Sequence, residues 1–101
     1  MPVKCREDQR RLIVWVEGEL DHHRARTVME EVDRRIDQAQ PRELTMDLAG
    51  LTFTDSSGIA VLIRAYRRMS QIRGAMRVVN TPPQANKVFQ AAGLERLIRF
   101  E

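Results

Sequence analysis

The feature that most constrains this chain is the alternation of short apolar runs with longer amphipathic segments. Runs at 12–18, 43–48 and 76–80 have the length and apolar content of β-strands. Between them, apolar residues recur at three- and four-residue steps, as on one face of a helix: Ala25, Val28, Met29, Val32 and Ile36, then Ile59, Leu62, Ile63, Tyr66 and Met69. Strands that alternate with helices predict βαβ crossovers and a parallel sheet.

Both ends of the chain extend this pattern. Val3, Cys5 and Glu7 alternate with polar residues, which predicts an edge strand, and a turn at 8–11 makes that strand antiparallel to the next. A third helix is expected after Thr81-Pro82-Pro83, because proline is tolerated in a first helical turn. Its inward-facing residues and closing glycine, and the short strand that follows, are expected at Val88, Phe89, Ala92, Gly93 and 97–100.

The strand at 43–48 indicates how many faces of the sheet are covered. Leu44, Met46 and Leu48 alternate with Thr45 and Asp47, so only one face is apolar. We therefore predict one two-layer α/β domain over residues 1–101. It has a mixed, mostly parallel sheet of four or five strands, with the helices mainly on one face.

Composition limits which cellular compartment and which classes of partner are expected. Cys5 is the only cysteine, which excludes an internal disulfide and fits a reducing compartment, so we expect a cytoplasmic protein. The N-terminus is too charged for a signal peptide, and no apolar run approaches the length that spans a bilayer. Of 17 basic residues 15 are arginines, but they are spread along the sequence and only five aromatics accompany them. This favours a solvated surface of mixed charge over a nucleic-acid site.

Polar segments follow three of the predicted strands. They are Glu19–His23, the stretch around Asp55-Ser56-Ser57-Gly58, and Asn80 with the prolines after it. In parallel βαβ units these segments share one rim of the sheet, so Asp21 and Ser56 are expected to lie close together. Three helix N-termini should meet there and favour negative charge.

Enzyme chemistry at this rim is weakly supported. Asp21, His22 or His23, and Ser56 or Ser57 could form a triad, but the serines lack the glycine of a G-x-S-x-G elbow. The adjacent Asp21-His22-His23 diverge around a helix, and no Cys-x-x-Cys or phosphate-binding loop is present. We predict no metal and no cofactor, and a small serine hydrolase is kept as a remote alternative.

The serine pair allows two interpretations. Asp55, Ser56 and Ser57 can be the cap and turn residues of a helix start, and Gly58 permits close backbone approach. For an isolated DSSG segment this is the stronger interpretation. It leaves one hydroxyl exposed, and a serine at a helix N-terminus is a good phosphate acceptor, because the added charge meets free N–H groups.

Three segments carry a resemblance to a known family: GELDHH (18–23), FTDSSGIAVLI (53–63) and AAGLERLIRFE (91–101). Together they resemble the STAS domain family, above all the anti-sigma factor antagonists of sporulating bacteria. The resemblance implies a regulator, not an enzyme. Its partner would be an anti-sigma factor with serine kinase activity, bound in the unphosphorylated state so that the sigma factor is released.

The resemblance also implies which residues act. The kinase would phosphorylate the first serine of the motif, Ser56, and a serine phosphatase would reverse the reaction. Asp21 matches the acidic residue beside the phosphate acceptor. The expected partner-binding residues are Asp21, His22, Asp55, Ser56, Ser57, Gly58 and Asn80. We expect a monomer with no direct nucleic-acid or membrane contact. A STAS module in another partner-switching cascade, such as a stress response, remains an alternative.

Overall fold

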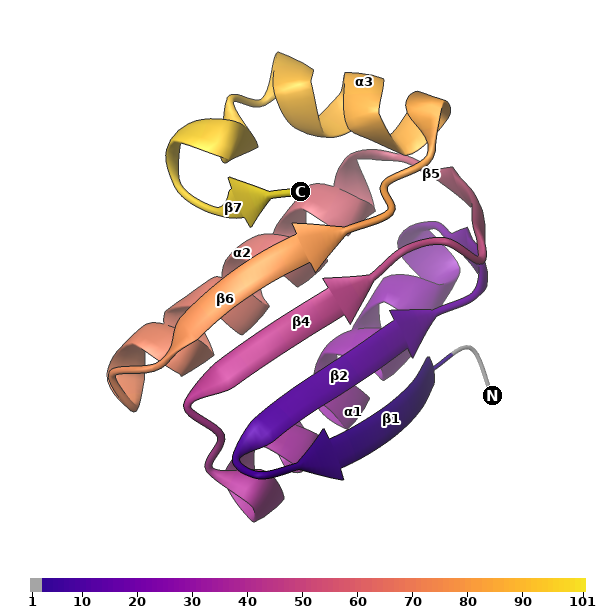
Figure 1. The fold of residues 1–101 in the computed structure, drawn as a ribbon. Helices are drawn as coiled ribbons and strands as arrows, with labels where there is room; N and C mark the ends of the chain where they lie inside the picture. Colours follow the sequence, from indigo (N-terminus) through magenta and orange to yellow (C-terminus); the bar gives the residue numbers. More distant parts are fainter. Residues whose placement is uncertain (1–2) are drawn as a thin grey trace.

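The computed structural model describes residues 3–101 and is built on a five-stranded sheet with strand order β1-β2-β4-β6-β7 (Figure 1). The β1–β2 pair is antiparallel, and every other neighbouring pair is parallel. The predicted mixed, mostly parallel sheet is therefore confirmed. The strands span Val3–Asp8 (β1), Arg11–Val16 (β2), Glu43–Asp47 (β4), Ala75–Val79 (β6) and Arg99–Phe100 (β7).

Two long helices, α1 (His22–Ala39) and α2 (Ser56–Gln71), cover one face of this sheet (Figure 1). The shorter α3 (Pro83–Ala91) and a 3-10 turn, η1 (Leu94–Arg96), lie beyond the β6 side. Residues that alternate along the strands divide between the faces as predicted. Leu44 and Met46 are fully buried under the helices, whereas Thr45 is half-buried on the open face.

The sequence did not predict a second, two-stranded sheet. The run at 12–18 is not one strand, because β2 ends at Val16 and the chain turns at Gly18, whose φ is +79°. Only glycine adopts this backbone readily. The Gly18 N–H donates to the Gly50 carbonyl at 2.9 Å. From there β3 (Gly18–Leu20) runs parallel to β5 (Leu51–Thr54).

Two details of the predicted helical faces differ from the structure. The deepest residues of α2 are Val61, Leu62, Ala65 and Met69, whereas Ile59, Ile63 and Tyr66 are half-buried at the edge of the core. The buried arc of α2 is thus rotated by about a residue, because the helix packs on α1 as well as on the sheet. In α3 the prediction that Ala92 faces inward is wrong. The helix ends at Ala91, and Ala92 is exposed as the chain turns at Gly93 (φ +72°).

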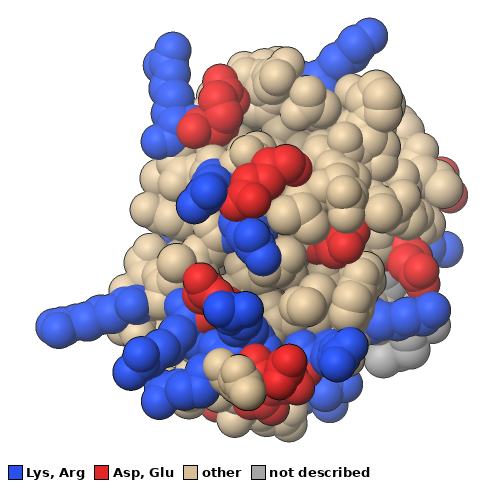
Figure 2. Space-filling model, viewed as in Figure 1, with Lys and Arg blue, Asp and Glu red and all other residues tan. Residues whose placement is uncertain are grey.

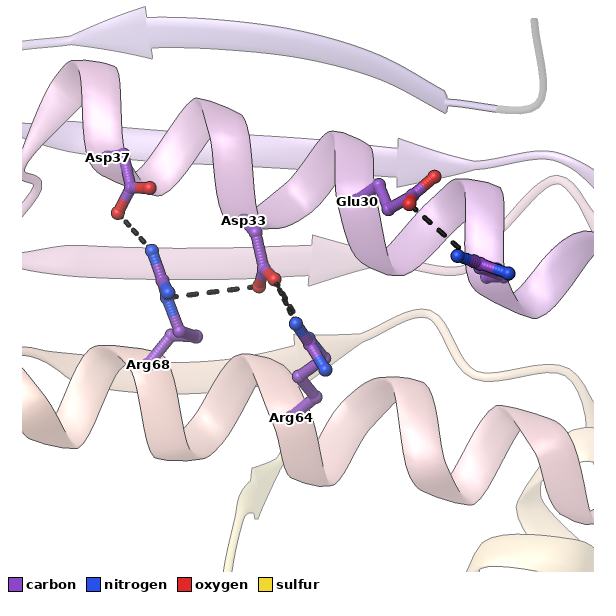
Figure 3. A network of polar contacts seen from close by, with 6 residues as sticks. Glu30, Asp33, Asp37, Arg64 and Arg68 are labelled. Carbon is purple, nitrogen blue, oxygen red and sulfur yellow. Dashed lines mark hydrogen bonds and ion pairs between the residues drawn. The ribbon is translucent and has the colours of Figure 1, made fainter.

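Ion pairs connect the solvent-facing sides of α1 and α2 (Figure 3). Asp33 accepts from Arg64, with Nη2 at 2.7 Å, and lies 3.9 Å from Arg68 Nε. Arg68 also pairs with Asp37 one turn further along α1. The carboxylate of Asp33 is only 15% exposed, so it is shielded from water better than most surface charges. The Asp33 carboxylate also raises the pKa of Arg64.

Candidate functional site

The site is built where two strand-to-helix junctions lie side by side. β3 and β5 are parallel, with Leu20 opposite Thr54 in the register. The residues that follow, Asp21 and Asp55, therefore leave adjacent strands, which are spaced by about 4.8 Å. α1 begins one residue after Asp21, and α2 begins one residue after Asp55. The predicted proximity of the two segments thus has its basis in a strand pair that the sequence did not reveal.

A carboxylate caps each helix. Asp21 Oδ1 accepts the backbone N–H groups of His23 (3.0 Å) and Arg24 (3.1 Å). Asp55 Oδ1 accepts the N–H of Ser57 at 2.8 Å. Both contacts satisfy N–H groups that a helix start leaves without partners. The cap of α2 is therefore Asp55, and neither serine is needed for it.

The environment of Asp55 favours its charged form. The Ser57 N–H lowers the pKa of Asp55 below its ordinary value, and the Ser57 hydroxyl and the His22 N–H act in the same direction. His22 is the first residue of α1. N–H groups at the N-termini of both helices thus stabilise the charged carboxylate, and the helix dipoles also favour negative charge there.

The two serines differ in their access to solvent. Ser56, the first residue of α2, is exposed, whereas Ser57 is half-buried and its N–H is bound by the Asp55 cap. Ser56 stands at the N-terminus of α2, next to the capping residue Asp55. A group transferred to its hydroxyl would project into solvent beside both junctions.

Thr54 and Gly58 fix the position of the second junction. Thr54 is fully buried, and its hydroxyl donates to the Leu20 carbonyl at 2.8 Å. This bond ties β5 to β3 immediately before the caps. A β-carbon on Gly58 would lie 2.2 Å from Thr54 Oγ1. Glycine at this position is therefore required by packing, in agreement with the close approach that the sequence suggested.

The start of α3 is attached to the same junction. The Thr54 N–H donates to Gln84 Oε1 at 3.0 Å, and Gln84 Nε2 donates to the Thr54 carbonyl at 2.8 Å. The side-chain amide of Gln84 thus pairs with the backbone of β5 as a neighbouring strand would. It brings the third helix N-terminus to the rim, as expected from the parallel topology.

The predicted residues do not all converge. Asp21, His22, Asp55, Ser56, Ser57 and Gly58 lie at the two junctions. Asn80 instead donates to both carboxylate oxygens of Asp47, each at 3.2 Å, where β4 and β6 end. His22 and His23 are exposed, and their rings pack edge to face with centroids 5.9 Å apart.

Sequence reasoning missed three residues here. Thr54 and Gln84 are 30 positions apart, and nothing local to either indicates that they pair. Phe53 is 41% exposed on β5, two positions before the Asp55 cap. Its exposure could have been expected only if residues 51–54 had been recognised as a strand outside the main sheet.

Among residues 3–101, no group of three or more His, Cys, Asp or Glu side chains is arranged to hold a metal ion. Over the same residues, no helix has the length and apolarity needed to cross a bilayer.

Sequence comparisons show which proteins this chain is similar to. The profile described as the STAS domain matches residues 2–101. The anti-sigma F factor antagonist of Paenibacillus polymyxa is 33% identical over 87 residues, which are 86% of this chain and 74% of that protein. The antagonist of Lysinibacillus sphaericus is 31% identical over 83 residues, which are 82% of this chain and 71% of the relative.

Solved structures agree in fold. The anti-sigma factor antagonist SpoIIAA in its unphosphorylated form superposes with a TM-score of 0.84 at 25% identity, covering 98% of this chain and 87% of that one. The phosphorylated form of the Bacillus cell fate determinant SpoIIAA gives a TM-score of 0.75 at 24% identity, covering 98% and 90% of the two chains.

Proposed function

We propose that this chain, which belongs to the STAS domain family, acts as an anti-sigma factor antagonist whose binding is switched by a phosphate on Ser56. Its relatives are non-enzymatic regulators named as anti-sigma F factor antagonists. The proposed partner is an anti-sigma factor that is also a serine kinase. A serine phosphatase resets the switch, and a stress-response cascade in place of a sporulation one is the alternative setting.

The contrast between the two serines carries the proposal. Ser56 is exposed at the first position of α2, and Ser57 is half-buried with its N–H bound to Asp55. A kinase needs to bring a hydroxyl to the γ-phosphate of ATP, which an exposed side chain permits. The structure of one similar protein was solved in a phosphorylated form, which supports phosphorylation as the modification that operates the switch.

Electrostatics is sufficient for the switch. A phosphate adds about −1.5 to −2 charges. At ~7 Å from an acidic group its repulsion is roughly 1 kcal/mol in water and ~5 kcal/mol at an effective dielectric constant of 20. The second value applies once a partner covers Asp21 and Asp55 and excludes water. Since 1.4 kcal/mol is a factor of ten, a loss of about 10- to 1,000-fold in affinity needs no change of fold.

The site argues against hydrolysis as a second function. A serine nucleophile needs a base within hydrogen-bond reach that is itself oriented by a third group. His22 and His23 are exposed and pack edge to face against each other, and the carboxylates of Asp21 and Asp55 accept backbone N–H groups. The arrangement therefore fits a surface that is modified better than one that catalyses.

The position of the phosphate tests the proposal. The anti-sigma factor that co-purifies with the protein is incubated with ATP and with wild type, Ser56→Ala and Ser57→Ala, and the products are mapped by mass spectrometry. We expect one phosphate on wild type and on Ser57→Ala, at Ser56, and none on Ser56→Ala. Modification of Ser57 in the wild type would refute the assignment.

A further inference from the structure

Arginines gather at the end of the sheet opposite Ser56. Three connections lie there: the β1–β2 turn, the α1–β4 loop and the α2–β6 loop. The Arg42 N–H donates to the Arg10 carbonyl and the Ala75 N–H to the Arg42 carbonyl, both at 2.8 Å. Figure 2 shows many Lys and Arg side chains, with some Asp and Glu between them, over this lower end of the molecule. We call Arg10, Arg42 and Arg73 the arginine end.

The three side chains are exposed, and none makes an ion pair with a residue in the range 3–101. Two nearby acids are already engaged, since Glu43 pairs with Arg11 at 3.0 Å and Asp37 with Arg68. Asp8, in the same turn as Arg10, is exposed and makes no ion pair with the described residues. Three guanidinium groups thus stand against one unengaged carboxylate of the turn, so the arginine end keeps an excess of positive charge.

Two of these arginines occupy backbone positions that favour glycine. Arg10 (φ +67°) is the second central residue of a two-residue hairpin turn in which Asp8 pairs with Arg11. Turns with this geometry favour Asn-Gly. Arg73 (φ +58°) is the left-handed residue after α2, where glycine is again usual.

The α2–β6 loop does contain a glycine, Gly74, but it is needed for close packing and not for a left-handed backbone. Gly74 follows Arg73, and a β-carbon there would lie 2.4 Å from Met69 Cε and 3.0 Å from the Arg42 carbonyl. Strained backbone is a reason to look for function. Arg10 and Arg73 each place a guanidinium side chain at a backbone position that glycine or asparagine would fit better.

We propose that the arginine end is a second interaction surface and that it binds an acidic segment of a partner protein. Guanidinium groups pair with carboxylates through two parallel hydrogen bonds. Single-stranded nucleic acid also needs aromatic side chains for stacking. The five aromatics lie elsewhere, on β2, β5, α2, α3 and β7: Trp15, Phe53, Tyr66, Phe89 and Phe100.

Two further features define the surface. The apolar residues of these loops are covered, since Pro41 is buried and Ile72 half-buried, so nothing there is available to insert into lipid. The parallel strands separate the arginine end from the Ser56 junctions, because one lies at their amino ends and the other beyond their carboxyl ends. The two surfaces can be occupied at the same time.

The test uses the full chain and a fluorescein-labelled polyglutamate peptide, followed by fluorescence anisotropy at about 50 mM salt. The variant Arg10→Asn/Arg42→Gln/Arg73→Asn removes the arginine end, and asparagine tolerates the left-handed backbone. The control Arg26→Gln/Arg67→Gln/Arg96→Gln makes the same change in net charge, from +3 to 3 − 3 = 0. We expect about a tenfold or greater loss of affinity for the first variant and less than about threefold for the control.

The midpoints of thermal unfolding show whether a variant loses peptide binding because it is less stably folded. The first variant should unfold at or above the wild-type temperature, because two strained arginines are replaced. The proposal is overturned by absence of peptide binding to wild type, or by equal losses in both variants. It is also overturned if duplex DNA or phosphatidylserine vesicles bind more tightly than the peptide at the same salt. Ser56→Asp should leave peptide binding unchanged, and a loss there would show that the surfaces are not independent.

Discussion

A β-carbon on Gly58 would lie 2.2 Å from Oγ1 of Thr54, whose hydroxyl is bonded to the Leu20 carbonyl at 2.8 Å. The glycine of the DSSG segment therefore has a structural task. It lets the first turn of α2 rest against the buried threonine that joins β5 to β3. The exposed serine of the same turn depends on this contact for its position.

Replacing Gly58 by alanine should destabilise the protein. The added methyl group displaces either α2 or the Thr54 hydroxyl, and overpacking of this kind costs about 1–3 kcal/mol of unfolding free energy. Gly50→Ala is the matched control, because its β-carbon would meet the flexible side chain of Glu17 at 3.0 Å. Urea unfolding measures both. A Gly58→Ala protein as stable as Gly50→Ala would show that the junction is not tightly packed.

The charge on Asp55 should make its contribution to stability depend on pH. Its folded pKa is lowered from 3.8, mainly by the Ser57 N–H. A lowered folded pKa stabilises the protein above the unfolded pKa, and this stability is lost as pH falls through the folded pKa. Asp55→Asn keeps a capping oxygen but has no charge to lose.

The measurement compares urea unfolding of wild type and Asp55→Asn at about pH 6 and about pH 3. At about pH 6, wild type should have a larger free energy of unfolding than Asp55→Asn. At about pH 3, the difference between the two proteins should be smaller. A gap of the same size at both values would mean that the cap acts through geometry alone.

Most of the fold could be predicted because it depends on local periodicity. The alternation at 43–48 and the helical spacing at 25–36 each reflect burial on one face, and the structure confirms both. The β3–β5 pair could not be predicted in this way. It depends on the left-handed turn at Gly18 and on a partner strand more than 30 positions away.

The candidate site shows the same division. The capping role of Asp55 follows from residue type at a helix start, and it was predicted. The hydrogen bonds between Gln84 and Thr54 join residues that carry no local signal of their pairing, and they could not be predicted. At the other end of the molecule, arginines from separate loops lie together although the sequence shows them as dispersed.

The shielded ion pairs between α1 and α2 should contribute more than exposed ones. Asp33→Asn weakens the contacts to both Arg64 and Arg68, and the Asp33 carboxylate is 15% exposed. Glu30→Gln is the control, because Glu30 and Arg26 are 66% and 88% exposed and 3.6 Å apart. An exposed pair of this kind is worth about 0.2–0.5 kcal/mol, and we expect at least twice that loss for Asp33→Asn in urea unfolding. Equal losses would assign the network no special role.

Asp21→Asn separates a capping role from a binding role. Asparagine caps nearly as well as aspartate, so stability should change by no more than about 0.5 kcal/mol. If the carboxylate also pairs with a basic group on the anti-sigma factor, truncation should cost about 2–5 kcal/mol of binding free energy. Titration calorimetry with the purified partner measures the difference. An affinity equal to that of wild type would remove Asp21 from the proposed surface.

The most direct test of the switch is titration calorimetry of the anti-sigma factor with unphosphorylated protein and with protein phosphorylated at Ser56. Amide NMR spectra of both forms should show that the fold is retained, with shifts confined to the two junctions and their surroundings. We expect the phosphate to weaken binding by about 10- to 1,000-fold. Affinities of the two forms within about twofold of each other, with the phosphate confirmed on Ser56, would contradict a switch based on charge at this junction.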